Sequence, residues 1–256
     1  MSGGSHLLRI RDAQARQSTP MSRPGQFALL LAHPSLHLVR RPMSIHDEGD
    51  GWRSYMVKPV GPATRELVGL AVGGQVDISP PLGNGFPRVL GPDPLLLVGG
   101  GFGIAPLYFL ARRLEAQAAG PEVRILYGGR SARDVELDAL AGLRSEILPS
   151  TDDGSLGFHG TCVDRCVDLL RREGKRAARF TVLTCGPHAM MAALYRAVHG
   201  LVHEVYVSLE EIMACGVGVC MGCVTRTGEG TVPICTHGPV FRGSDLVDIA
   251  LETGHV

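Results

Sequence analysis

The sequence lacks an excess of charge of either sign, because 25 Lys and Arg residues balance 25 Asp and Glu residues. A protein that tracks nucleic acid usually carries a clear basic excess, so we set that class aside. The N-terminus has no apolar run behind a basic start, so it carries no recognisable secretory signal. The uncharged run at residues 94–111 is interrupted by four glycines and two prolines, and a strand, a glycine loop and a helix explain it better than a membrane span.

Internal repeats and low-complexity tracts are also missing, and the seven cysteines are an odd number. Without an export signal, this cysteine content argues for a reducing, cytoplasmic location and makes disulfides the poorest explanation of the thiols. A chain of 256 residues has room for one large domain or two to three small ones.

The first part of the chain shows short apolar runs separated by turn residues. "LLRIRD", "QFALLL", "SYMVKPV" and "QVDISP" are the expected strands, with no convincing long helix among them. Strands at this spacing favour a small antiparallel β-barrel over residues 1–92, although a sandwich would show the same pattern.

The pattern changes at "GPDP", after which strands and helices alternate. "LLLVGG", "VRILYGG", "RFTVLTCG" and "HEVYVSL", the last strand, alternate with the helical segments "IAPLYFLARRLEAQ", "DVELDALAGL", "CVDRCVDLLRREG" and "HAMMAALYRAVHG". Alternation of this kind predicts an α/β domain with a parallel sheet at residues 93–208. Residues 209–256 are rich in glycine and cysteine and lose the periodicity, which indicates a third, small domain.

Four cysteines follow the spacing C-x4-C-x2-C-x11-C, and they are the most specific signal in the chain. This is the plant-type [2Fe–2S] spacing, and the glycines between the cysteines let backbone N–H groups approach sulfur. A structural zinc site more often pairs two C-x2-C knuckles, and only one is present, so zinc is the weaker alternative. The expected ligands are Cys215, Cys220, Cys223 and Cys235. Cys162 and Cys166, four residues apart on a predicted helix, are better explained as small buried side chains.

Three further motifs suit flavin and nucleotide ligands. "RRPMSI" offers an Arg fork for phosphate and a Ser hydroxyl for a ring nitrogen, although an exposed basic turn would look the same. "KPVGPATREL" would set Thr64 at a helix start, which is a seat for pyrophosphate. "VGGGFGIAPL" follows a strand and opens a helix, but it departs from the G-x-G-x-x-G fingerprint at Ile104. A nucleotide explains its four glycines better than a simple turn does.

In order along the chain, these motifs resemble one family. "PGQF", "RRPMSI", "PLGNGF", "VGGGFGIAPL", "YGGRS", "TDDGSLGFHG", "TCGPHAMM", "VSLEEIMACGVGVCMGC" and "CTHGPVF" are similar to the electron-transfer subunits of type B dihydroorotate dehydrogenase, within the ferredoxin–NADP reductase superfamily. The resemblance runs from about Pro24 to Asp245. It implies an FAD-binding barrel, an NAD-binding α/β domain and a C-terminal [2Fe–2S] domain.

The resemblance also implies which residues contact each cofactor. The implied FAD contacts are Arg41, Pro42, Met43, Ser44, Met56, Val57, Lys58, Ala63 and Thr64. The implied NAD contacts are Gly99, Gly100, Gly101, Gly103, Cys185, Gly186 and Pro187. Lys58 and Ala63 depart from the family's usual Arg and Gly, which puts the affinity for FAD in question. Arg130, Ser131 and Arg133 would suit a 2′-phosphate, but the family resemblance favours NAD.

The resemblance implies an electron relay in pyrimidine biosynthesis. A partner subunit carrying FMN would oxidise dihydroorotate, and electrons would pass through [2Fe–2S] and FAD to NAD. The resemblance also implies a heterotetramer with two copies of each subunit. We identify no Ser-His-Asp arrangement and expect no acid–base catalytic residue in this chain. Sulfide dehydrogenases, hydrogenase subunits and ferredoxin–NAD(P) reductase complexes share the three modules and stay open as alternatives. A zinc-stabilised binding module without redox function is the alternative from another class.

Overall fold

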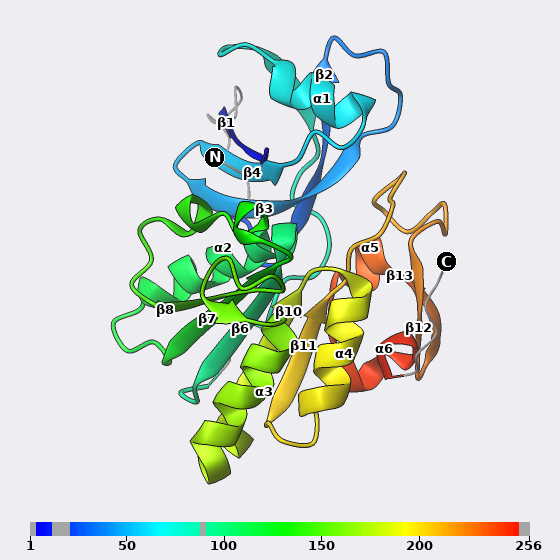
Figure 1. Cartoon of the computed structure of the whole chain (residues 1–256). Coiled ribbons are helices and arrows are strands. Elements are labelled where there is room, and N and C mark those ends of the chain that lie inside the picture. The colour runs from blue at the N-terminus through cyan, green and yellow to red at the C-terminus, as the bar shows by residue number, and fades with distance from the viewer. Residues whose placement is uncertain (1–3, 12–20, 88–90, 251–256) are drawn as a thin grey trace.

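We describe the fold from a computed structural model, covering residues 4–11, 21–87 and 91–250. Figure 1 shows an antiparallel sheet at one end of the molecule, a parallel sheet flanked by helices at the other, and a C-terminal segment along one side. No helix within these residues is long and apolar enough to cross a membrane.

The N-terminal module is an antiparallel sheet with strand order β1-β4-β3-β2-β5. Its inner face packs around Leu30, Ile45 and Tyr55, which are fully buried together with Phe109 of the next module. The elements are β1 (His6–Arg11), β2 (Phe27–His33), β3 (Arg41–Gly49), β4 (Trp52–Val57), α1 (Pro62–Gly69) and β5 (Gln75–Ile78). The sheet is the antiparallel flavin module that the sequence predicts.

The second module is a seven-stranded sheet with the order β14-β11-β10-β6-β7-β8-β9. All its neighbouring strands are parallel except β14, which runs antiparallel to β11. The strands are β6 (Leu95–Gly100), β7 (Val123–Gly129), β8 (Glu146–Thr151), β9 (Phe158–His159), β10 (Thr181–Cys185), β11 (Glu204–Ser208) and β14 (Val240–Arg242). Every residue of β6 is buried, as expected of a central strand covered on both faces.

Helices cover both faces of this sheet and divide the core in two. One core includes α2 (Ile104–Glu115), whose side chains pack with Leu95, Leu97 and Tyr127. The other includes α3 (Cys162–Glu173) and α4 (His188–Val198). Cys162 and Cys166 lie in this second core, 5% and 0% exposed, and burial raises the pKa of Cys162 to about 11. Their predicted role as small buried side chains is therefore confirmed.

The C-terminal segment combines a small hairpin with short helices. It contains β12 (Val224–Thr227), β13 (Gly230–Pro233), α5 (Ile234–His237), the strand β14 and α6 (Val247–Ala250). Because β14 pairs with β11, placing Val240 opposite Ser208, this segment completes the sheet of the preceding module.

Two expectations about elements are wrong. "DVELDALAGL" forms no α-helix and instead contains a 3-10 turn at Leu137–Leu140, because only Ala139 and Leu140 of that turn are buried. The strand β11 is not the last strand of the parallel sheet along the chain, because β14 forms an additional edge strand beside it. A three-residue strand in a glycine-rich segment is too short to show alternation in the sequence.

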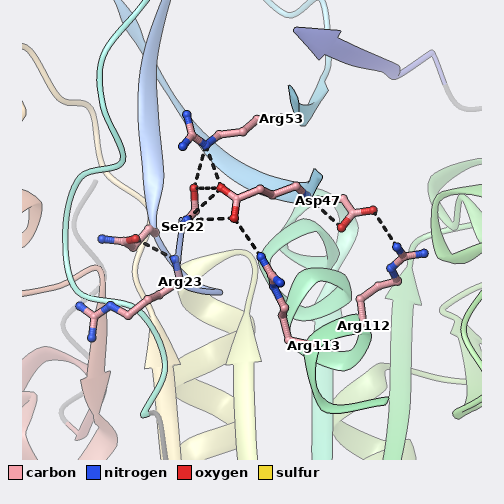
Figure 2. Close-up of polar contacts among 8 residues, drawn as sticks. Ser22, Arg23, Asp47, Arg53, Arg112 and Arg113 are labelled. Atoms are coloured by element: carbon pink, nitrogen blue, oxygen red, sulfur yellow. Dashed lines mark hydrogen bonds and ion pairs between the residues drawn. The ribbon is translucent and has the colours of Figure 1, made fainter. Parts of the chain in front are cut away.

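The two larger modules are joined by three successive residues of β3, shown in part in Figure 2. His46 stacks on Tyr108 of α2 with ring centroids 4.1 Å apart. Asp47 forms an ion pair with Arg112 at 3.6 Å, and Glu48 forms one with Arg113 at 2.8 Å. Since the predicted flavin residues begin the same strand, β3 links the flavin motif directly to the helix that follows the glycine loop.

Candidate functional site

The predicted flavin residues lie on three adjacent elements of the N-terminal module. Arg41, Pro42, Met43 and Ser44 begin β3 and are half-buried. Antiparallel pairing places Ser44 opposite Phe27 of β2. Half-buried side chains at a strand start leave atoms accessible to a ligand, which suits the predicted contacts.

The second flavin segment runs from the end of β4 into α1. Met56 and Val57 are buried, while Lys58 is exposed and its Nζ lies 5.3 Å from the ring centroid of Phe102. Phe102 belongs to the glycine loop of the second module. Lys58 therefore stands where the two modules meet, a position that spacing along the sequence does not show.

The start of α1 is suited to an anion. Its N-cap residue is Gly61, and no side chain caps the helix. The Thr64 hydroxyl instead accepts a hydrogen bond from Gly61 N and donates one to Gly61 O, both at 2.9 Å. By contrast, α3 is capped by Thr161, which accepts from Asp164 N. A helix start without a side-chain cap presents backbone N–H groups to an anion, so the seat predicted at Ala63 and Thr64 fits pyrophosphate.

The glycine loop and the segment after β10 are brought together. Parallel pairing sets Cys185 opposite Gly99 at the carboxyl edge of the sheet. A Cβ added to Gly103 would lie 2.1 Å from the carbonyl oxygen of Cys185, and one added to Gly100 would lie 3.0 Å from Pro187 Cδ. The loop therefore needs glycine to pack against the neighbouring turn.

Gly101 differs from the other loop glycines because it faces open space. Its φ of +54° favours glycine, yet no atom lies within 4 Å of a Cβ built there. The helices α2 and α4 both start at this edge, and neither has a side-chain cap. An open glycine beside two uncapped helix starts is an arrangement that fits a dinucleotide at the carboxyl edge of a parallel sheet.

Glu210 is a candidate residue that the sequence reasoning missed. The Cys185 thiol is fully buried and donates a hydrogen bond to Glu210 Oε1 at 3.6 Å. Part of the Glu210 side chain is exposed, but its carboxyl end lies beside this thiol, and desolvation there raises the pKa of Glu210. Its position two residues beyond β11 was the available signal, because parallel strands end at one edge.

The four predicted cluster cysteines lie in the C-terminal segment and associate in pairs. The thiol of Cys215 lies close enough to that of Cys220 to influence its titration, and the thiol of Cys235 lies likewise beside that of Cys223. Among the described residues, no group of three or more His, Cys, Asp or Glu side chains is arranged around one point to hold a single metal ion. Two pairs of thiols match a cluster with two irons, each taking two sulfurs, and thiolate is the donor that iron–sulfur clusters use.

Backbone N–H groups point at the sulfurs, as the glycines in this segment predict. Gly218 N donates to Cys235 Sγ at 3.1 Å, and Cys220 N donates to Cys215 Sγ at 3.4 Å. Hydrogen bonds from Val217 and Cys220 lower the pKa of Cys215 to about 6, whereas burial raises that of Cys235 to about 11. The loop is therefore arranged to stabilise negative charge on sulfur at its outer end.

The cluster loop packs directly on the flavin module. A Cβ added to Gly216 would lie 2.8 Å from Leu29 Cδ1 of β2, so the backbone of the cluster loop packs against the Leu29 side chain. Asn84 strengthens the contact, because its side-chain amide donates to the carbonyl oxygens of Thr236 and His237 at 3.2 and 3.1 Å. The cysteine loop is thus in contact with β2, the strand that pairs with the predicted flavin residues of β3.

Comparison with known proteins agrees with this geometry. Residues 210–247 match the family model described as the iron–sulfur cluster binding domain of dihydroorotate dehydrogenase B. The electron transfer subunit of dihydroorotate dehydrogenase B (NAD(+)) from Bacillus velezensis is 38% identical over 234 residues, which is 88% of each chain. The subunit of the same name from Clostridium acetobutylicum is 35% identical, covering 88% of this chain and 86% of its own.

This chain belongs to the family of electron-transfer subunits of dihydroorotate dehydrogenase B. A solved structure of an NADH-dependent reduced ferredoxin–NADP oxidoreductase, a flavin-based electron-bifurcating protein, has a TM-score of 0.76 and 29% identity, covering 95% of this chain and 85% of the other. Phthalate dioxygenase reductase, at 18% identity and a TM-score of 0.63, shows the same fold over 91% of this chain and 89% of its own.

Family membership confirms several predictions from the sequence. The three-module fold class, the role as an oxidoreductase subunit in electron transfer, and the cofactors FAD, [2Fe–2S] and NAD are borne out. Of the residues considered for a 2′-phosphate, Ser131 instead bonds Asp134, its hydroxyl donating to Oδ2 at 3.0 Å. The individual cofactor contacts stay predictions, and they are taken up below.

Proposed function

We propose that this subunit conveys electrons from an FMN-bearing catalytic subunit, which oxidises dihydroorotate to orotate, to NAD⁺. When bound, the cofactors supply the redox chemistry: one-electron transfer by the [2Fe–2S] cluster and two-electron hydride transfer by the flavin. The observation that carries the proposal is the contact of the cysteine loop with β2 of the flavin module, at Gly216 and Leu29. It supports a direct route between the two cofactors.

The residues of the flavin module would hold and orient FAD. Arg41 and Lys58 offer positive charge for phosphate, and the uncapped start of α1 offers N–H groups from Ala63 and Thr64. Ser44 would lie near the flavin ring as a hydrogen-bonding group. Pro42, Met43, Met56 and Val57 would complete the contacts with apolar surface.

The residues at the carboxyl edge of the parallel sheet would place the nicotinamide. The backbone at Gly99, Gly100, Gly101 and Gly103 and at Gly186 and Pro187 would let the nucleotide lie close to the protein. Cys185 would shape this site rather than act as a nucleophile, because burial and the neighbouring Glu210 raise its thiol pKa well above the usual value.

The proposal includes a partner, because no residue set in the described parts of this chain looks fit to remove a proton and a hydride from a dihydropyrimidine. We propose two copies of each subunit in a heterotetramer, located in the cytoplasm, where cluster thiols stay reduced. We keep residues 1–92, 93–208 and 209–256 as the limits of the FAD, NAD and cluster domains. Residues 1–3 and 251–256 fall outside the described residues.

Reconstitution tests this function. The anaerobically purified chain should be orange-brown, with flavin and iron–sulfur bands in its visible spectrum. With the cognate catalytic subunit it should form NADH from dihydroorotate and NAD⁺. Absence of NADH formation by a complex that carries its full complement of flavin and iron would contradict the proposal and favour a reductase with another electron donor.

A further inference from the structure

The loop between β2 and β3 exposes two leucines almost completely. Leu36 is 95% exposed and Leu38 is 96% exposed, and both follow the strand end at His33. Singly exposed apolar side chains are common, but two in one short loop at this exposure concentrate apolar surface that no residue of the described ranges covers.

Polar contacts hold this loop in place. The Ser35 hydroxyl donates to Glu66 Oε2 of α1 at 2.5 Å, and His37 Nε2 lies 3.6 Å from Glu66 Oε1. Arg40 closes the loop with an ion pair to Asp77 of β5 at 2.5 Å. The alternate residues Ser35 and His37 thus fix the backbone while the leucines project into solvent. A surface ordered in advance loses less conformational entropy on binding a partner.

The cluster loop carries a second exposed apolar surface, which we call the cluster rim. It consists of Ile212, Val217, Val219 and Met221, which are 87%, 56%, 80% and 50% exposed. Residues 212–225 include no charged side chain. Met221 adopts a φ of +53°, a conformation that costs a side-chain-bearing residue about 1–2 kcal/mol relative to the usual one. Glycine would avoid that cost, so the methionine adds exposed apolar surface at a position where the backbone favours glycine.

The two apolar surfaces lie on the same side of the molecule. Figure 1 shows the β2–β3 loop above the C-terminal segment, both on the right of the view. The contact between Gly216 of the cluster loop and Leu29 of β2 connects them, since β2 ends at His33, where the loop with Leu36 and Leu38 (the leucine loop) begins. The four residue steps from Leu29 to His33 span about 13 Å as extended strand, so both apolar surfaces fit within the width of one protein interface.

We propose that Leu36 and Leu38, together with the cluster rim, form the docking surface for the FMN-bearing catalytic subunit. The inference rests on the proposed function, because electron transfer into the cluster requires the partner to lie against the rim. The leucine loop continues that contact onto the flavin module. A surface with exposed apolar side chains, a methionine among them, and without Asp, Glu, Lys or Arg in residues 212–225 has the composition of an interface centre, where these residues are depleted.

The experiment measures binding of the full, cofactor-loaded chain to the catalytic subunit by isothermal titration calorimetry. The test variant is Leu36→Glu/Leu38→Glu, and Leu36→Met/Leu38→Met keeps the apolar character. Leu201→Glu is the matched control, because Leu201 is also exposed, at 45%, but precedes β11 and lies at the other end of that strand from the cluster segment. Reduction of ferricyanide by NADH reports the integrity of the isolated chain without the partner.

The glutamate variant should lower the affinity for the catalytic subunit by about tenfold or more, while the methionine variant and Leu201→Glu bind like the unmodified chain. Ferricyanide reduction should stay unchanged in all of them. Affinity within twofold of the unmodified chain would overturn the docking proposal. Loss of a homodimer of this chain, seen by light scattering, with unchanged binding to the catalytic subunit would also overturn it. If the unmodified chain itself failed to bind the catalytic subunit, the proposed function would fail instead.

Discussion

Glu48 of β3 accepts a hydrogen bond from Arg113 of α2 at 2.8 Å, which ties the flavin module to the nucleotide module. The Glu48 side chain is only 6% exposed, and it also accepts from Ser22 N and from Arg53 Nε at 3.0 Å (Figure 2). One buried carboxylate therefore satisfies donors from three segments. Because β3 carries the flavin motif and α2 follows the glycine loop, this contact fixes the spacing of the two sites.

Replacing Glu48 by alanine should destabilise the protein by about 3 kcal/mol, since it leaves the half-buried Arg53 and Arg113 without their shared counter-charge. Urea denaturation followed by circular dichroism measures the change. Asp77→Asn is the matched control, because the Asp77–Arg40 pair is 46% and 44% exposed and its loss should cost under about 1 kcal/mol. Equal effects of the two substitutions would contradict the importance of burial.

His46 should make the junction of the modules sensitive to acid. It is 3% exposed, its Nε2 lies 3.0 Å from the carbonyl oxygen of Ala139, and burial lowers its pKa below 6.5. The unfolded chain therefore binds the proton more readily, and stability present above pH 6.5 is lost as the pH falls towards the lowered pKa.

The loss of stability attributable to His46 should reach at most about 1.4 kcal/mol per pH unit. Urea midpoints at pH 7.5 and 5.5 for the unmodified chain and for His46→Gln measure it. The Gln variant should lose less stability over this interval. If both proteins respond to pH equally, His46 does not carry the effect.

Two glycines of one loop should behave differently. Alanine at Gly103 would place its Cβ 2.1 Å from the Cys185 carbonyl oxygen, so the loop cannot keep its packing and the folded protein should be lost or strongly destabilised. Alanine at Gly101 meets no atom, and its φ of +54° costs about 1–2 kcal/mol. Gly101→Ala should fold, with a several-fold higher KM for NADH in ferricyanide reduction. An unchanged KM would contradict a nucleotide seated over Gly101.

Lys58→Arg should strengthen the binding of FAD several-fold, because a guanidinium can pair with phosphate through two parallel hydrogen bonds and can also stack on Phe102. Titration of the flavin-free chain with FAD, followed by quenching of flavin fluorescence, measures the affinity. Lys58→Gln removes the charge and should weaken binding. Equal affinity of all three proteins would show that residue 58 makes no contact with FAD.

Cys220→Ser should remove the iron–sulfur absorption and the electron paramagnetic resonance signal of the reduced protein, while most of the flavin stays bound. Serine replaces a thiolate donor in the cluster loop, whereas the flavin residues lie on β3, β4 and α1. Cys166→Ala is the control, since this buried cysteine lies in the α3 core. Simultaneous loss of cluster and flavin would show that the two sites depend on each other for folding.

Much of the fold could be predicted because local pattern and tertiary structure agree. The run Leu95–Gly100 reads as a buried strand and is the fully buried centre of the parallel sheet. Within Cys162–Glu173 the apolar residues recur at the helical period and a glycine follows. The helix α3 has these bounds, with Gly174 as its C-cap. The spacing of the cluster cysteines was equally informative, since it is fixed by the size of what they bind.

Other features depend on contacts between distant segments, and no local pattern contains them. Glu210 meets Cys185 only because two parallel strands end together. Glu48 and Arg113 are 65 residues apart and look like ordinary surface charges in the sequence. The strand β14 has three residues, too few to show alternation, and it is defined by pairing with β11.

Because of that pairing, the stability of the iron–sulfur segment and that of the preceding domain depend on each other. Removing the tail would uncover the edge of β11 and leave its backbone donors open to pairing with other chains, so a shortened protein should aggregate rather than survive as a simple flavoenzyme. Exchange of electron-donor modules by gene fusion would have to preserve this edge strand. The segment with the cluster cysteines therefore also supplies an edge strand on which the folding of the parallel-sheet domain depends.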